Sequence, residues 1–173
     1  PLVLFPGDYE FGGAAELVAA AWPAVVARRR AHLCFACRAK TPAAAEARRR
    51  IEADLQAAGV GDRATFVGET PFIHDLLAAS DLVVLPASSL FAKMDIQLVL
   101  LEALALGVPI VIADVDPVRE VLDPDLGGAD AGLRVPAGDA AALAAAIGDL
   151  LDAPARRAAM GEVGRRLVIE RFG

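Results

Sequence analysis

The stretch Leu98-Val99-Leu100-Leu101-Glu102-Ala103-Leu104-Ala105-Leu106-Gly107-Val108-Pro109-Ile110-Val111-Ile112-Ala113 contains the alternation that decides the fold. Its first half predicts a helix over Gln97–Leu106, which ends at Gly107 because glycine readily adopts the left-handed conformation that terminates helices. Its second half, Pro109–Ile112, is a continuous apolar run, typical of a strand covered by helices on both faces. The stretch therefore predicts a helix leading into a buried parallel strand.

The same alternation continues in both directions along the chain. Six strands are predicted, at Leu2–Phe5, Ala31–Ala36, Ala64–Val67, Leu82–Leu85, Pro109–Ile112 and Gly132–Val135. Helices are predicted at Gly13–Arg29, Pro42–Ala58, Pro71–Ala79, Gln97–Leu106, Pro117–Leu122, Asp139–Asp152 and Ala155–Arg171. This order is typical of a Rossmann-like three-layer α/β/α fold with a mostly parallel sheet of about six strands.

Composition sets the size and class of the molecule. The 173 residues are 56% hydrophobic and 23% charged, which excludes intrinsic disorder and fits one domain over residues 1–173. Because 38 residues are alanine, Val, Leu, Ile and Phe must supply most of the core volume. The chain begins directly on a predicted strand, Leu2–Phe5, so we expect it to be part of a longer protein.

Charge and hydropathy exclude several partners. A net charge of −6 disfavours a general nucleic-acid binder, which needs a basic stripe to neutralise phosphates. We interpret the basic runs Arg28–Arg30 and Arg48–Arg50 as solvated side chains. No charge-free apolar run reaches about 18 residues, and no signal peptide is visible. With two cysteines, the sequence indicates a cytoplasmic protein, compatible with peripheral contact with the inner membrane face.

The loop after the first strand is the first candidate binding segment, because ligands of such sheets bind beyond the carboxyl ends of strands. Gly7, Gly12 and Gly13 lie there, before a predicted helix. The loop is neither a Walker A sequence, since Gly13-Ala14 replaces Lys-Ser/Thr, nor a G-x-G-x-x-G fingerprint. Two readings stay open: a plain glycine-rich turn, or close approach of a ligand to the backbone.

A second candidate segment precedes the helix at Gln97–Leu106. Lys93 and Asp95 lie in its loop, and the free N–H groups at the helix start attract phosphate. Glu102 interrupts an otherwise apolar helix, where a buried carboxylate is costly unless it accepts hydrogen bonds. Ribose hydroxyls are suitable donors; the alternative is that Glu102 lies on an exposed helix face.

Other reactive side chains give no site. Cys34 and Cys37 match C-x-x-C, but positions i and i+3 of a strand point to opposite faces, which disfavours a redox pair or metal site. His32 and His74 have no partner at ligand spacing, and we interpret them as solvated or core side chains. His74 lies near the predicted ligand edge. We expect no metal and no cofactor.

The sequence resembles the carboxyl-terminal, donor-binding domain of GT-B glycosyltransferases of the retaining family 4 (glycosyl transferases group 1). The resemblance covers essentially the whole chain. It is carried by Leu98–Ala103 followed by Gly107–Val111, and by Asp62–Gly68, Leu76–Pro86, Gly132–Asp139 and Glu170–Phe172.

The resemblance implies an enzyme that moves a sugar from a nucleotide diphosphate sugar to a glycan or lipid-linked acceptor, with retention of configuration. It implies that Glu102 binds the donor ribose and that the amides of Gln97, Leu98 and Val99 bind the diphosphate. An amino-terminal domain, absent from these 173 residues, would bring the acceptor, so we expect the isolated domain to bind nucleotide without turnover.

The chain departs from the family at three places. Met94 stands where the family has a Glu that contacts the donor sugar, so Asp95 becomes the candidate for this catalytic contact. Asp8 follows Gly7 in place of an Arg, and Gly12-Gly13 replaces a Lys; Arg38, Lys40 or Lys93 would have to supply the missing cation. These changes leave two alternatives open: a non-catalytic or regulatory partner of a transferase, and an unrelated Rossmann-like or flavodoxin-like nucleotide domain.

Overall fold

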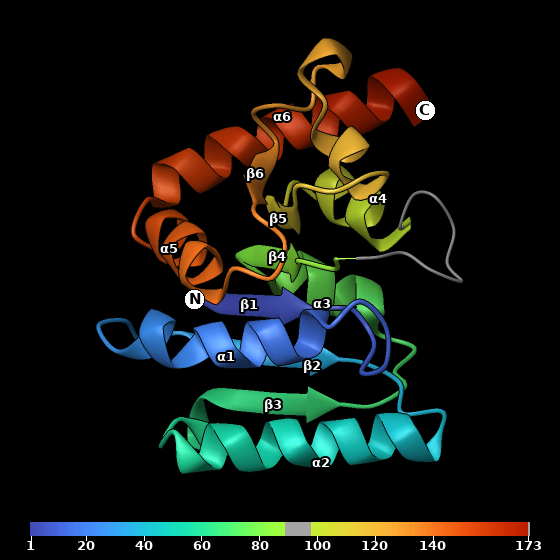
Figure 1. Ribbon diagram of the computed structural model, residues 1–173. Coiled ribbons are helices and arrows are strands. Elements are labelled where there is room, and N and C mark those ends of the chain that lie inside the picture. The colour runs from blue at the N-terminus through green and yellow to red at the C-terminus, as the bar shows by residue number, and fades with distance from the viewer. Residues whose placement is uncertain (89–97, 173) are drawn as a thin grey trace.

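The computed structural model describes residues 1–88 and 98–172, which form one six-stranded sheet covered by helices on both sides (Figure 1). The strands are β1 (Leu2–Phe5), β2 (His32–Ala36), β3 (Ala64–Val67), β4 (Leu82–Leu85), β5 (Ile110–Ala113) and β6 (Gly132–Val135). Their order is β3-β2-β1-β4-β5-β6, and every pair is parallel. The predicted Rossmann-like fold is confirmed, and the order differs from the flavodoxin-like one.

The helices form the two outer layers. They are α1 (Ala14–Val26), α2 (Pro42–Ala57), α3 (Ile73–Ala79), α4 (Leu98–Ala105), α5 (Ala140–Leu151) and α6 (Pro154–Phe172). Helix α1 packs against α2 and α5, whereas α4 packs against α3 and α6. Strands β1 to β3 are added toward one edge of the sheet and β4 to β6 toward the other. The switch point is therefore between the adjacent strands β1 and β4, and ligands of such sheets bind near it.

Helix ends lie where the sequence signals them. At the end of α4, Gly107 N–H donates to Leu104 O and Val108 N–H donates to Ala103 O, both at 2.9 Å, and Gly107 has a positive φ of 76°. These two bonds satisfy carbonyls that the helix leaves without partners. At the start of α5, the Asp139 side chain accepts from Ala142 N–H at 2.8 Å, so the predicted N-cap is confirmed.

One predicted helix is of a different type. Residues Val118–Leu122 form a 3-10 helix (η2) and not an α-helix. Asp123, which follows it, is extended with φ −68° and ψ 125°, as residues before a proline usually are. Pro124 therefore leaves too little chain for a regular α-helix. The structure adds two further 3-10 segments, Gly61–Arg63 (η1) and Pro124–Leu126 (η3), which the sequence does not predict. The other element bounds differ from the prediction by at most three residues, the largest difference being at the end of α1.

The core lies between the sheet and its two helical layers. Every residue of β4 and β5 is buried, which explains why these strands are apolar throughout. Trp22 and Phe35 are the largest of the fully buried side chains together with Phe5, and Trp22 Nε1–H donates to Arg63 O at 3.1 Å. The core volume therefore comes from strand residues and a few aromatic rings, while alanines keep the helices close to the sheet.

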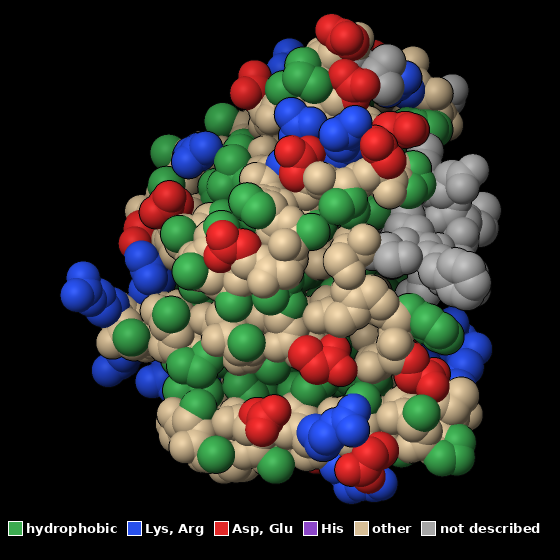
Figure 2. All heavy atoms as spheres, in the orientation of Figure 1, with side chains coloured by type: hydrophobic (Ala, Val, Ile, Leu, Met, Phe, Trp, Pro, Cys, Tyr) green, Lys and Arg blue, Asp and Glu red, His purple; other side chains and the backbone are tan. Residues whose placement is uncertain are grey.

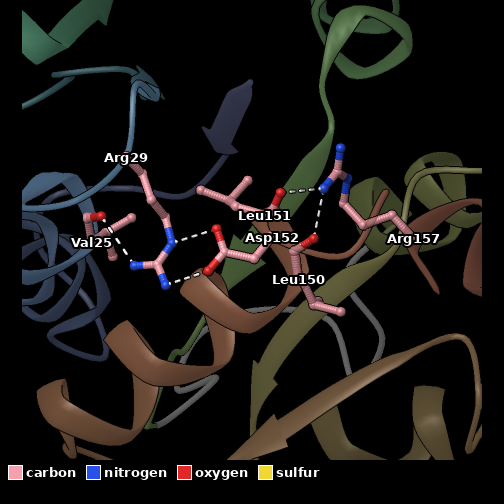
Figure 3. A network of polar contacts seen from close by, with 6 residues as sticks. All are labelled: Val25, Arg29, Leu150, Leu151, Asp152 and Arg157. Atoms are coloured by element: carbon pink, nitrogen blue, oxygen red, sulfur yellow. Dashed lines mark hydrogen bonds and ion pairs between the residues drawn. The ribbon is translucent and has the colours of Figure 1, made fainter. Parts of the chain in front are cut away.

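Arg29 corrects the interpretation of the first basic run as solvated. Its guanidinium binds both carboxylate oxygens of Asp152, at 2.9 Å through Nε and 2.6 Å through Nη2 (Figure 3). The ends of α1 and α5 meet there, although the two residues are far apart in sequence. A paired, forked contact of this kind orients both helix ends.

Surface charge and hydropathy agree with a globular domain. On the face that Figure 2 shows, acidic and basic side chains are interspersed among apolar ones. Within the described residues, no helix is both long enough and apolar enough to cross a bilayer.

Candidate functional site

A cavity of about 250 Å³ opens at the carboxyl ends of β1, β2 and β3. It is lined by Pro6, Gly7, Ala36, Arg38, Gly68, Glu69, Thr70, Ile73 and Val99. These residues come from three strand ends and from the first turns of α3 and α4. The cavity thus brings together Gly7 and Val99, which the sequence placed in one binding site.

Close packing explains why residue 7 is a glycine. A Cβ on Gly7 would lie 2.3 Å from the ring of Phe5, which is fully buried beneath it. Gly12 and Gly13 instead have positive φ values of 71° and 59°, which favour glycine. The loop is therefore a glycine-rich turn whose first glycine lines the cavity floor.

Hydrogen bonds hold the β1–α1 loop in place, some from a side chain of the loop itself and others from residues in two other segments. Asp8 Oδ1 accepts from Glu10 N–H at 3.1 Å and from Phe11 N–H at 2.8 Å. Thr41 Oγ1 donates to Glu10 Oε1 at 2.6 Å, and Ser88 Oγ donates to Gly12 O at 2.9 Å. Asp8, which stands where the family usually has an Arg, therefore acts on its own loop.

A second cavity, of about 350 Å³, lies on the other side of this loop. It is lined by Gly12, Gly13, Glu16, Leu17, Ala20, Pro86, Ser88 and Gly138. The described lining of this cavity contains a carboxylate but no Lys or Arg. The sequence-predicted glycines are consequently divided, with Gly7 in the first cavity and Gly12 and Gly13 in the second.

Arg38 is the cation in the described lining of the first cavity. Its Nη1 lies 3.3 Å from Glu69 Oε1, and the two side chains are 55% and 76% exposed. Such an exposed ion pair contributes little to stability, so Arg38 can exchange Glu69 for another anion at small cost.

Glu102 meets a residue that the sequence analysis left without a partner. His74 Nε2 lies 3.2 Å from Glu102 Oε1, with side-chain exposures of 66% and 40%. Glu102 is therefore half-exposed and paired, neither buried alone nor simply solvated. Leu98, at the start of the same helix, is 58% exposed, whereas Val99 faces the first cavity.

The remaining predicted site residues, Lys93, Asp95 and Gln97, lie outside the described residues. Among the residues that the structure describes, no group of three or more His, Cys, Asp or Glu side chains could hold a metal ion.

Both cysteines are free and buried, and Cys37 lies in sequence between Ala36 and Arg38, which line the first cavity. Its Sγ donates to Phe5 O at 3.7 Å. Burial is the main cause that raises the pKa of Cys37 from 9.0 to about 12, and burial also raises the pKa of Cys34. At neutral pH both thiols are therefore protonated and weak nucleophiles.

The raised pKa of Cys37 predicts a loss of stability at alkaline pH. Between about pH 9 and 12 the unfolded chain has lost the thiol proton that the folded chain retains, so the free energy of unfolding falls as pH rises. The expected loss attributable to Cys37 is about 2 kcal/mol between about pH 8 and 10.5. Urea denaturation at both pH values measures it, and Cys37→Ala should reduce the loss; an equal loss in the variant would contradict the assignment.

The strand order, with a glycine-rich first loop and a cavity at the carboxyl ends of the strands, defines a Rossmann-like class of α/β domain. Within that class, the sequence profile described as "Glycosyl transferases group 1" matches residues 1–153. The chain belongs to the glycosyl transferases group 1 family, which excludes an unrelated Rossmann-like or flavodoxin-like domain.

Comparisons with individual proteins agree with this family. Over 123 residues the chain is 33% identical to a GDP-mannose-dependent monoacylated alpha-(1-6)-phosphatidylinositol monomannoside mannosyltransferase of Corynebacterium glutamicum, covering 67% of this chain and 31% of that protein. The structure resembles sucrose-phosphate synthase from Thermosynechococcus elongatus, with a TM-score of 0.85, 30% identity, and 100% of this chain matched to 41% of that one. It also resembles the C-terminal domain of a glycosyl transferase group 1 family protein from Francisella tularensis, with a TM-score of 0.81, 20% identity, and coverage of 99% and 85%. The chain thus spans less than half the length of the curated relative and of the synthase.

Proposed function

We propose that this chain is the donor-binding domain of a retaining glycosyltransferase that uses a nucleotide diphosphate sugar. The observation that carries the proposal is the cavity in which Gly7, Arg38 and Val99 meet, one helical turn from Glu102. Family membership and the printed activity of the mannosyltransferase relative support it. The match to an isolated C-terminal domain supports the assignment to the donor-binding half.

In the proposed complex, the nucleoside occupies the first cavity and its ribose hydroxyls donate to Glu102. The diphosphate extends past Gly7 toward the first turn of α4, where backbone N–H groups and the helix dipole favour negative charge. When the glycosidic bond of the donor breaks, these donors stabilise the charge that builds on the departing diphosphate. This electrostatic role needs no metal ion or organic cofactor from the protein.

Arg38 is our candidate for the cation that replaces the family's Arg and Lys. It lines the cavity from the β2–α2 loop, whereas the usual positions carry Asp8 and Gly12. Binding of an anionic ligand would exchange its contact with Glu69 for one to phosphate. The acceptor, a glycan or a lipid-linked molecule, would be bound by an amino-terminal domain of the full-length protein, in the cytoplasm.

Titration calorimetry of the chain with UDP, GDP and ADP tests the proposal. We expect millimolar or tighter binding of at least one of them, without turnover of the matching sugar nucleotide. Glu102→Ala should weaken binding at least tenfold, because a hydrogen bond to a charged group contributes about 1.5–3 kcal/mol. Arg38→Ala should weaken it roughly three- to tenfold.

The matched control is Arg49→Ala, which removes an exposed α2 arginine that pairs with Glu46, away from the cavity lining. Its affinity should equal that of the wild-type chain. Absence of binding by the wild-type chain, together with an unchanged Glu102→Ala variant, would refute the donor-binding function.

A second candidate function is a non-catalytic binding partner of a transferase. It is favoured by Asp8, whose carboxylate is used within its own loop at the position of the family's phosphate-binding Arg. A full-length protein that is inactive with a panel of donors, yet activates a co-expressed transferase, would support this alternative over a catalytic role.

A further inference from the structure

His74 lies against the carboxylate that the proposed function assigns to the donor ribose. Its Nε2 is 3.2 Å from Glu102 Oε1, a contact that joins the first turn of α3 to the middle of α4. The preceding residue Ile73 lines the first cavity, and so does Val99, which lies three residues before Glu102 and hence on the same face of α4. The pair therefore stands at the rim of this cavity, where two of its lining helices meet.

The contact restricts a side chain that would otherwise be mobile. Glu102 is 40% exposed, and a half-exposed glutamate samples several rotamers, whose loss on binding opposes association. The 3.2 Å contact between His74 Nε2 and Glu102 Oε1 favours one arrangement of the carboxylate before the ligand arrives. Preorganisation of this kind improves affinity without a direct contact between the positioning residue and the ligand.

Because both side chains are partly exposed, the contact between His74 and Glu102 is expected to orient Glu102 and not to stabilise the fold. His74 is 66% exposed, and exposed pairs of this type contribute little to folding. The contact is thus poorly placed to hold α3 against α4, but well placed to orient Glu102.

We propose that His74 is a positioning residue that orients the Glu102 carboxylate toward the hydroxyls of the donor ribose. This role rests on the proposed donor-binding function. It assigns to His74 a share in distinguishing ligands with ribose hydroxyls from ligands without them.

Calorimetry with a ribonucleoside diphosphate and its 2′,3′-dideoxy counterpart tests the role in the 173-residue chain. His74→Ala should weaken binding of the ribonucleotide about three- to tenfold and leave binding of the dideoxy compound unchanged. His74→Gln should restore most of the affinity, because the glutamine amide can donate from a similar distance along the side chain. In the Glu102→Ala background, His74→Ala should add no further loss.

The matched control is His32→Ala, which removes the other histidine; His32 contacts Thr65 Oγ1 at 2.7 Å at the amino-terminal end of β2. This variant should bind both nucleotides like the wild-type chain. Equal weakening of both nucleotides by His74→Ala, or no weakening of either, would overturn the role of His74 while the donor-binding function stands. If the wild-type chain binds neither nucleotide, both the donor-binding function and the role of His74 are refuted.

Discussion

Replacement of Gly161 by alanine is expected to lower the free energy of unfolding by at least about 2 kcal/mol, although alanine is the better helix former. A Cβ at this position of α6 would lie 2.0 Å from the backbone oxygen of Gly107, which ends α4. Backbone cannot move aside as a flexible side chain can, so α6 must shift. Overpacking typically costs about 1–3 kcal/mol and occasionally more, and a 2.0 Å approach to backbone belongs at or above the upper end of that range, so a net loss of at least about 2 kcal/mol remains after the gain of about 1 kcal/mol in helix propensity.

The shift of α6 is also expected to disturb the candidate site, because α6 packs against α4, which carries both Val99 and Glu102. Thermal unfolding should show a midpoint lowered by roughly 5–10 °C. The matched control is Gly61→Ala in η1, where the new Cβ would meet the end of the exposed Gln56 side chain at 2.2 Å, a group that can move. Gly61→Ala should therefore change stability by less than about 1 kcal/mol. Similar losses in both variants would show that α6 does not hold α4 by this close approach.

Replacement of Arg157 by alanine is expected to be the second large perturbation, of about 2–4 kcal/mol. Its side chain is only 13% exposed, and Nη1 donates to Leu150 O at 2.6 Å and to Leu151 O at 2.8 Å (Figure 3). These carbonyls belong to the last turn of α5, where the helix leaves carbonyls without a full set of partners; Leu150 O also accepts from Ala153 N–H at 3.2 Å. Nη2 also pairs with Asp81 Oδ1 at 3.3 Å, and Asp81 Oδ2 accepts from Leu2 N–H at 2.7 Å.

Arg157 thus joins α5 and α6 to the amino-terminal ends of β1 and β4, on the side of the sheet opposite the cavities. Its removal should lower the thermal midpoint by roughly 5–12 °C while nucleotide affinity, measured well below that midpoint, stays unchanged. Arg156→Ala, which removes the neighbouring exposed arginine, serves as the control and should have little effect. Loss of nucleotide affinity in folded Arg157→Ala would contradict the separation of this network from the site.

Most of the fold could be predicted because its signals are local. The continuous apolar runs at Leu82–Leu85 and around Ile110 are buried on both faces, and their predicted strands agree with the structure within a residue. Gly107 and Asp139 mark helix ends through their own backbone and side-chain chemistry. The sequence predicts the wrong helix type at Val118–Leu122, because its five residues, which lie between two prolines, are too few to show a clear period.

The candidate site was harder to predict because it depends on contacts between distant segments. Nothing in the sequence shows that His74 and Glu102 meet, since this follows only from the rotation of α3 against α4. The position of His74 after the β3 strand, near the ligand edge, was the one available signal. For the same reason Arg29 was wrongly interpreted as solvated, although it binds Asp152. Gly7 and Val99 were predicted together, and the cavity contains both.

The most direct test of the donor-binding account is a crystal structure of this chain soaked with the nucleoside diphosphate that binds most tightly in calorimetry. We predict that the base and ribose occupy the cavity lined by Gly7, Arg38 and Val99. A ribose hydroxyl should lie within hydrogen-bond distance of Glu102. A nucleotide bound elsewhere, or one in this cavity whose ribose points away from Glu102, would contradict the account.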